Sequence, residues 1–322
     1  MTLPFAVTFE AFTSFGFWTS VGILAGIYTL FSLGLQLNVG FTGIVNFGQA
    51  GFMAIGAYAM GILVVKYDWS FWLALPAAVL IAIGFGLLIG LPSLRLRADY
   101  FAIATIAAAE IVRITAQNAR ELTGGNQGLF GFEGEWDNVS DTIEGWLQSL
   151  GWSDPETLFP LFLVVWVTAL LATAILHFAQ RSPWGRVLRA IREDEDAARA
   201  LGKNTLGYKL QSLAISATLG ALAGFFLALN LNFLNPEEFE PLFTFIGYAV
   251  LVLGGLANYW GVAFGAIIMW TILEGTRFVD LPISAEREAA VRFMIVGLVL
   301  ILLMAFRPQG IFGKREEMVL GE

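Results

Sequence analysis

The chain has 322 residues, of which 57% are hydrophobic and only 14% are charged, whereas soluble domains average roughly 45 to 50% apolar and about 25% charged residues. A water-soluble fold of this length could not bury so much apolar surface, so the composition excludes an ordinary soluble protein and predicts an integral membrane protein. The net charge is −8, and the absence of cysteine excludes disulfides, thiolate metal sites and cysteine nucleophiles.

Apolar stretches long enough to cross a bilayer recur along the chain. A transmembrane helix needs about 20 predominantly apolar residues. We expect such helices near residues 17–37, 48–65, 71–94, 98–117, 158–180, 210–230, 242–257, 260–278 and 290–306. The segment 242–257 is short of a full crossing, which leaves a re-entrant segment as the alternative there. The predicted fold is all-α, a single polytopic bundle of about 8–10 transmembrane helices over residues 1–322.

Small residues predict close packing between these helices. Glycines four residues apart, such as Gly86 with Gly90 and Gly220 with Gly224, lie on one face of a helix and allow the backbone of a neighbour to approach. We expect these pairs to pack the bundle.

Basic residues are distributed unevenly between the segments that connect the spans. They gather at Arg95 and Arg97, in the segment 181–209 and after residue 306, whereas 118–157 contains eight acidic residues and one arginine. Lysine and arginine accumulate in cytoplasmic loops. We therefore expect 181–209 and the C-terminus in the cytoplasm and 118–157 as an extracytoplasmic loop.

The connecting segment 181–209 has the pattern of short surface helices. Its apolar residues recur at roughly helical spacing, and Gly202 suits a helix C-cap. A solvated charged loop is the alternative, and composition alone does not separate it from a docking element. Its core, DAARALG from Asp196 to Gly202, resembles the EAA-type motif of ABC importer permeases, with aspartate where glutamate is usual. That resemblance implies a coupling helix seated in a groove of a cytoplasmic ATPase.

Five segments resemble the branched-chain and neutral amino acid ABC permeases, and among them the M-type subunit of the Liv systems. They are LNVGFTGIVNFGQAGFMAIGAYA at 37–59, LRLRADYFAIATIAAAEIVR at 94–113, TGGNQGL at 123–129, GRVLRAIREDEDAARALGKN at 185–204 and FRPQGIFGK at 306–314. The resemblance implies a multi-pass protein of the bacterial inner (plasma) membrane. It also implies ATPase-coupling roles for Arg189, Arg192, Glu195, Asp196, Ala197, Ala198, Leu201 and Gly202.

The resemblance further implies partners. These are a second, LivH-like permease subunit that completes the pore, two ABC ATPase subunits, an extracytoplasmic substrate-binding protein and membrane lipid, with no nucleic acid. The binding protein would contact Gly124, Gly125 and Asn126, for which a plain turn is the alternative. No lysine lies in the G-x-x-x-x-G-K-[ST] pattern. We therefore expect no cofactor in this chain, with ATP and Mg bound by the partner ATPase subunits.

A glycine-rich stretch between the first two spans contains the candidates for the translocation path, Asn38, Thr42, Asn46 and Gln49. Irregular backbone at membrane depth is tolerated where it is buried in protein or lines a wet cavity, so these residues could line a path for a zwitterion. The alternative is a tight helix crossing in which these amide side chains only join the helices by hydrogen bonds. Glu110, three residues before Arg113, is a further path candidate because intramembrane charge is costly. Structural pairing with Arg113 is its alternative.

The function predicted is the permease of an ATP-driven importer of branched-chain or other neutral amino acids, and not an enzyme. The alternatives are an ABC permease for urea or short amides and an ion-coupled secondary transporter, which would need intramembrane acids, where only Glu110 qualifies. A membrane-embedded enzyme would need a nucleophile, a metal cluster or a histidine pair. We expect no catalytic residue and no metal site, since His177 is the single histidine.

Overall fold

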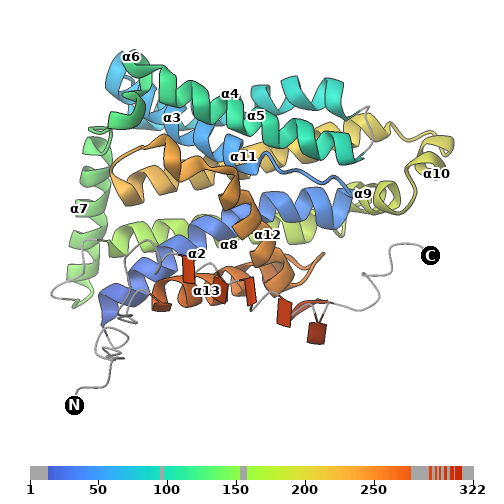
Figure 1. The fold of residues 1–322 in the computed structure, drawn as a ribbon. Coiled ribbons are helices and arrows are strands. Elements are labelled where there is room, and N and C mark those ends of the chain that lie inside the picture. Colours follow the sequence, from blue (N-terminus) through green and yellow to red (C-terminus); the bar gives the residue numbers. More distant parts are fainter. Residues whose placement is uncertain are drawn as a thin grey trace.

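The structure is a computed structural model that describes residues 14–94, 98–152 and 158–276, and within 290–313 the residues 290–291, 294–295, 297–298, 301–302, 305–307 and 309–313. Its regular elements in these ranges are helices, and one isolated bridge pairs Leu129 with Leu234. The predicted all-α bundle is confirmed (Figure 1).

Six long helices form the body of the bundle. They are α2 (Phe15–Leu35), α3 (Gln49–Tyr67), α4 (Phe71–Ser93), α5 (Ala98–Asn118), α8 (Phe159–Ala179) and α11 (Thr205–Leu231). α11 packs against α2, α3 and α4, which makes it the central helix. α2 and α11 are mostly buried, whereas most side chains of α4 and α8 are exposed or half-buried. Helices that are apolar on all sides yet exposed are typical of a bundle rim that faces lipid.

Five described helices are long and apolar enough to cross a membrane: α2 with its continuation to Thr42, α3, α4, α8 and α11. The expected span 98–117 is also a helix, α5, but Asp99, Glu110 and Arg113 make it more polar. The expected span 290–306 is helical at each of its described residues. The predicted number of eight to ten spans is therefore larger than the number of described helices that are long and apolar enough to cross a membrane.

The expected spans 242–257 and 260–278 form one bent pair. α12 (Pro241–Gly254) and α13 (Tyr259–Gly275) meet at 115° across a short break. The break contains positive φ angles at Gly255 (100°) and Ala257 (60°). With 14 residues α12 is only ~21 Å long, less than the ~30 Å bilayer core. Counting the pair as one span gives up to six crossings in the described helices.

Short helices cover the two ends of the bundle. At one end lie α6 (Arg120–Thr123), a 3-10 turn η2 (Gly125–Gln127), α7 (Gly134–Ser149) and a 3-10 turn η3 (Pro236–Phe239); at the other lie α9 (Pro183–Glu193) and α10 (Glu195–Ala200) (Figure 1). α7 runs across the end of the bundle and buries Trp136 and Leu147. The acidic segment 118–157, expected only as a loop, thus contains an amphipathic helix.

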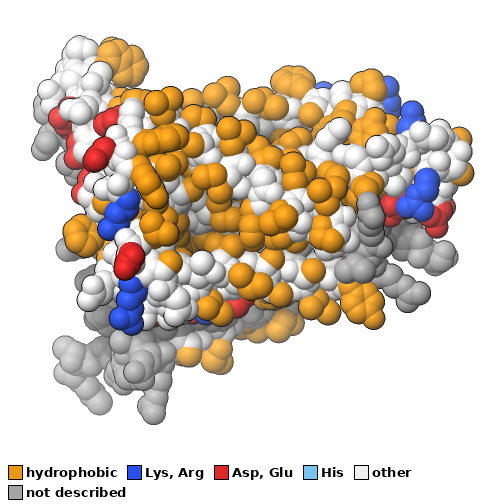
Figure 2. Space-filling view, turned by 90° about the horizontal axis from the view of Figure 1, so that it is seen from above, with side chains coloured by type: hydrophobic (Ala, Val, Ile, Leu, Met, Phe, Trp, Pro, Cys, Tyr) orange, Lys and Arg blue, Asp and Glu red, His pale blue; other side chains and the backbone are white. Residues whose placement is uncertain are grey.

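The surface changes character along the bundle axis. Figure 2 shows apolar side chains over the middle of the molecule and charged side chains gathered toward its two ends. This is the distribution expected of a protein whose middle is surrounded by hydrocarbon and whose ends meet water.

Candidate functional site

α2 does not end at a cap but continues into a π-helix, η1 (Gln36–Thr42). The π-helix stops at Gly43, whose φ of 73° is left-handed, and the Ile44 amide donates to the Asn38 carbonyl across 2.9 Å. Irregular backbone then continues until α3 begins at Gln49. π-turns within helices frequently mark functional sites. The glycine-rich stretch is thus irregular, as the sequence predicted, and most of its residues are buried in the bundle.

Asn38 and Thr42 bind the same serine of α11. The Ser212 hydroxyl donates to Asn38 Oδ1 (2.9 Å), and Thr42 Oγ1 donates to Ser212 Oγ (2.8 Å). All three side chains are buried. Asn38 Nδ2 is also buried and has no hydrogen-bond partner among the described residues. Buried donors are normally paired, so an unpaired amide here marks a place where a ligand acceptor would be favourable.

Gln49 makes more side-chain hydrogen bonds than Asn38, Thr42 or Asn46. Its Nε2 donates to the Phe31 carbonyl (3.2 Å) and the Ser216 carbonyl (3.1 Å), and its Oε1 accepts from Ser216 Oγ (2.8 Å) and Asn46 Nδ2 (3.3 Å). The Asn46 Oδ1 accepts from the Gly48 amide (2.8 Å). Every polar atom of Gln49 therefore has a partner, as expected of an amide that joins helices.

Two further helices reach the same segment. On α12, Tyr248 donates its hydroxyl to the Asn46 carbonyl (2.9 Å) and Thr244 accepts from the Ala50 amide (3.1 Å). On α5, Thr105 accepts from the Phe47 amide (3.0 Å). We call these three side chains, together with Asn38, Thr42, Asn46, Gln49, Ser212 and Ser216, the polar network. It links η1, the start of α3, α5, α11 and α12. The four amide and hydroxyl candidates of the sequence are brought together there.

Glu110 lies outside this polar network. Its carboxylate accepts from Arg113 Nε at 2.9 Å, and the two form an ion pair one helical turn apart on α5. Their side chains are 34% and 17% exposed respectively. The pairing that the spacing predicted is confirmed. The structure supports structural pairing for Glu110 more than a place beside Asn38 and Gln49.

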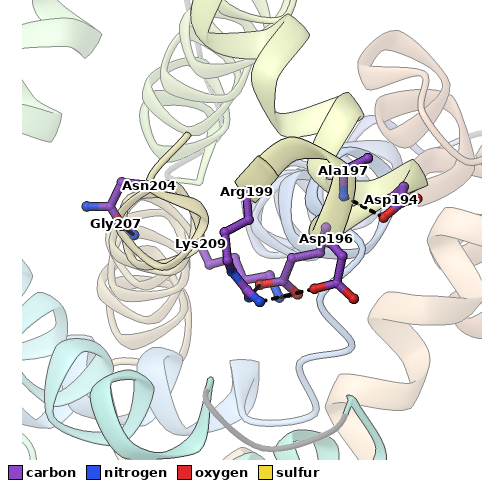
Figure 3. Close-up of polar contacts among 8 residues, drawn as sticks. Asp194, Asp196, Ala197, Arg199, Asn204, Gly207 and Lys209 are labelled. Atoms are coloured by element: carbon purple, nitrogen blue, oxygen red, sulfur yellow. Dashed lines mark hydrogen bonds and ion pairs between the residues drawn. The ribbon is translucent and has the colours of Figure 1, made fainter. Parts of the chain in front are cut away.

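The segment 181–209 folds into two short helices, as predicted. Asp194 begins α10 by accepting from the Ala197 amide (2.9 Å), a contact visible in Figure 3. Gly202 ends it with a φ of 79°, while its amide donates to the Arg199 carbonyl (2.9 Å) and the Lys203 amide donates to the Ala198 carbonyl (3.2 Å). These two bonds form a Schellman cap. The expected C-cap role of Gly202 is confirmed.

Glu195 ties α10 to the start of α11. Its carboxylate binds Lys209 of α11 and Arg199 of its own helix, and Arg199 also pairs with Asp196 at 3.0 Å (Figure 3). Burial on its own raises the pKa of Glu195, but the Lys209 hydrogen bond and the charges of Lys209 and Arg199 outweigh it and hold that pKa below its ordinary value. The carboxylate is therefore charged at neutral pH and fixes the loop to the bundle.

The coupling residues implied by the family motif divide into two sets. Asp196, Ala197, Leu201 and Gly202 are exposed, and Leu201 is 81% exposed at the tip of the loop. Ala198, by contrast, is buried. The exposed members form a small surface at the end of the molecule that nothing in the described chain covers.

Arg189 and Arg192 instead contact the π-helix. Arg192 donates to the Gly40 carbonyl, and the Arg189 guanidinium lies 5.7 Å from the centre of the Phe41 ring. Phe41 in turn stacks on Tyr259 at 4.6 Å. The loop is thus joined directly to η1. No local sequence signal reveals these contacts, because the partners are far apart in the chain.

The three residues expected at the binding-protein contact form a tight turn at the α7 end of the bundle. Gly124 and Gly125 both have positive φ, at 75° and 58°. Gly125 is buried, whereas Asn126 is exposed. The glycines shape the turn and only Asn126 offers a side chain to another molecule.

Sequence reasoning missed five hydroxyl residues of the network: Ser212, Ser216, Thr105, Thr244 and Tyr248. A signal existed for the two serines, which lie four residues apart on one face of α11 and are both buried. Hydroxyls that face other helices in a membrane commonly join them.

Comparison with known proteins gives a consistent set of similarities. The family described as "Branched-chain amino acid transport system / permease component" matches residues 18–304. The LivM permease protein of the high-affinity branched-chain amino acid transport system of Escherichia coli K12 is 34% identical over 306 residues, which cover 90% of this chain and 69% of that protein. A probable LivM protein of Methanocaldococcus jannaschii is 24% identical over 90% of this chain and 91% of its own length.

A second type of permease is also similar. The LivH permease protein of Escherichia coli K12 is 26% identical over 91% of this chain and 93% of its own length. No solved structure matches the chain.

Proposed function

Because this chain belongs to the family of branched-chain amino acid transport system permease components, we propose that it is one membrane subunit of an ATP-driven importer of branched-chain or other neutral amino acids. A LivH-like permease would complete the pore, two ABC ATPase subunits would hold ATP and Mg, and an extracytoplasmic binding protein would deliver the substrate. The chain itself is a multi-pass helical membrane protein whose family role is transport.

The observation that carries this proposal is the contact between η1 and the segment 181–209, which we call the coupling loop. The exposed tip of the loop, with Leu201 and Asp196, would meet the ATPase, while Arg192 on its inner side binds the Gly40 carbonyl. Gly40 lies between Asn38 and Thr42 in η1. A displacement of the loop by a closing ATPase would therefore reach the polar network without passing through a flexible linker.

The distribution of charge supports the proposed orientation. The seven basic residues of 181–209 lie in and around α9 and α10. The segment 309–313 lies at the same end of the bundle. The Ile311 amide donates to the Leu253 carbonyl (3.0 Å), and Asn258 donates to the Phe312 carbonyl (3.0 Å). Asn258 and Phe312 line a cavity together with Arg189 of α9. With the positive-inside rule, that end would face the cytoplasm. The acidic α7 end would face outward.

The polar network suits a cargo without net charge. It consists of amides and hydroxyls, and the unpaired Asn38 Nδ2 could donate to a substrate carboxylate or carbonyl. An ion-coupled transporter would instead need an acidic side chain at membrane depth that can bind a proton or a cation. The candidate for that role, Glu110, is already in an ion pair with Arg113. The uptake of labelled leucine, challenged with neutral amino acids, urea and short amides, would distinguish amino acid from amide transport.

The docking role can be tested at Leu201. Its side chain is 81% exposed, so Leu201→Asp leaves the fold intact and would disrupt an apolar contact with an ATPase. We expect the substitution to abolish co-purification of the ATPase chains and to reduce ATP-driven uptake in proteoliposomes at least about tenfold. Leu150→Asp is the matched control, since Leu150 is 67% exposed at the opposite end. Full uptake by Leu201→Asp, or uptake without any ATPase chain, would overturn the proposal.

A further inference from the structure

A cavity of about 290 Å³ lies where the C-terminal end of α8 meets α9, the α12–α13 break and the segment 309–313. We call it the interfacial cavity; its lining includes Arg181, Arg189, His177, Asn258 and Phe312. It is separate from the polar network, because no residue of the network lines it. Neither the contact between Arg192 and Gly40 nor the proposed translocation path requires such a cavity.

The interfacial cavity carries positive charge that the described residues do not neutralise. Among the described residues neither Arg181 nor Arg189 has a carboxylate partner; Arg189 donates to the Gln180 carbonyl (3.4 Å) and lies over the Phe41 ring. By contrast, Arg113 and Arg199 each bind a carboxylate. The two unneutralised guanidinium groups line one cavity, so a bound anion would be favoured there.

Exposed aromatic side chains lie beside the interfacial cavity where α8 ends, since Phe312 lines it and Phe178 and Trp260 contact His177 of its lining. Phe178, Trp260 and Phe312 are 69%, 41% and 43% exposed. The His177 ring lies 6.0 Å from Phe178 and 6.2 Å from Trp260 between ring centres. An exposed tryptophan such as Trp260 beside the end of a membrane helix is typical of the headgroup level of a bilayer. The cavity therefore opens at the depth where lipid phosphates lie.

We propose that the interfacial cavity binds the phosphate group of an anionic phospholipid. Arginine presents a planar fork of donors that matches phosphate oxygens, and basic pockets between membrane helices on the cytoplasmic side bind anionic headgroups. The assignment to the inner leaflet rests on the orientation proposed above. The bound lipid would touch Arg189, which also lies over Phe41 of η1, so its occupancy would stiffen the contact between the coupling loop and the π-helix.

Lipid retention by the purified full-length chain tests this site without any transport assay, so its failure would leave the proposed function untouched. Native mass spectrometry would follow phosphatidylglycerol and phosphatidylcholine bound to the wild type and to the double variant Arg181→Gln, Arg189→Gln. We expect one tightly held phosphatidylglycerol, binding of phosphatidylcholine that is about tenfold weaker, and at least about a tenfold loss of phosphatidylglycerol in the double variant.

The double variant Arg186→Gln, Lys203→Gln is the matched control, because it removes the same charge from the same end of the bundle, outside the cavity lining. It should retain phosphatidylglycerol as the wild type does. Thermal unfolding with inorganic phosphate in place of lipid separates the two sources of a phosphate group. Equal retention of the two lipids, unchanged retention in Arg181→Gln, Arg189→Gln, or equal stabilisation by inorganic phosphate alone would overturn the proposal.

Discussion

The Arg192 guanidinium donates a hydrogen bond to the Gly40 carbonyl across 152 residues of sequence. Gly40 lies inside η1, and Gly43, which ends the π-helix, has the Arg192 backbone close to it, since a Cβ built on Gly43 would lie 3.3 Å from Arg192 Cα. α9 thus lies directly against η1. The coupling loop and the polar network are therefore packed together, with η1 as the segment that contacts both.

Replacing Arg192 should separate ATP hydrolysis from transport. Arg192→Gln removes a charged donor from a carbonyl within the bundle, an interaction worth about 1.5–3 kcal/mol. We expect uptake by the assembled transporter to fall about tenfold or more while its ATPase activity persists, because the docking surface around Leu201 is unchanged. The ratio of ATP hydrolysed to leucine transported measures this directly.

Arg186→Gln is the control for that experiment, because Arg186 is exposed on the same helix and contacts the Arg181 carbonyl instead of η1. It should keep the wild-type ratio. A parallel loss of ATPase activity and uptake in Arg192→Gln would show that the residue acts at the docking surface and not through η1.

Gln49 and Asn38 should respond differently to replacement by alanine. Gln49→Ala breaks four hydrogen bonds in a fully buried position, and leaves Ser216 and the Phe31 carbonyl without that partner. We expect it to lower the free energy of unfolding by about 2–4 kcal/mol, measured as a drop in melting temperature in detergent.

Asn38→Ala removes a single hydrogen bond to the side chain, the one donated by Ser212, so its stability cost should be smaller, about 1 kcal/mol. Loss of the unpaired Nδ2 donor should instead raise the KM for uptake if this amide meets the substrate. An unchanged KM in correctly inserted Asn38→Ala protein would assign the polar network to helix packing alone.

The sequence predicted helices, the charged ends and the cap at Gly202 because these depend on local composition and spacing. It could not predict that Arg192 reaches Gly40 or that Ser212 joins Asn38 and Thr42, because such contacts are fixed by the packing of distant helices. α7 was missed although Trp136 and Leu147 face the same side, since its acidic residues dominated the composition. Spacing gave the Glu110–Arg113 pair correctly because both residues lie on one helix.

The ion pair of Glu195 should make the coupling loop sensitive to acid. Its pKa in the folded protein lies below the ordinary value of 4.5, so the charged form contributes stability above that value. The contribution is lost as pH falls from about 4.5 through the lower folded-state pKa. Glu195→Gln should therefore be less stable than the wild type at pH 7, and the difference should shrink steadily below pH ~4.5. A difference that is constant with pH would show that the carboxylate's charge is not what stabilises the loop.

Packing between α3 and α11 should fail when a single glycine is enlarged. A Cβ at Gly56 would collide with the backbone of Ala221, which no side-chain rotation can relieve. Close approach of two membrane helices depends on such small residues. Gly56→Val should therefore force the helices apart and break the hydrogen bonds that Ser212 and Ser216 of α11 make in the polar network. We expect a loss of several kcal/mol in stability or failure to insert. Gly84→Val in α4 is the matched control, because nothing lies within 4 Å of its Cβ position. Gly84→Val should insert and transport normally, and normal melting of Gly56→Val would contradict the α3–α11 contact itself.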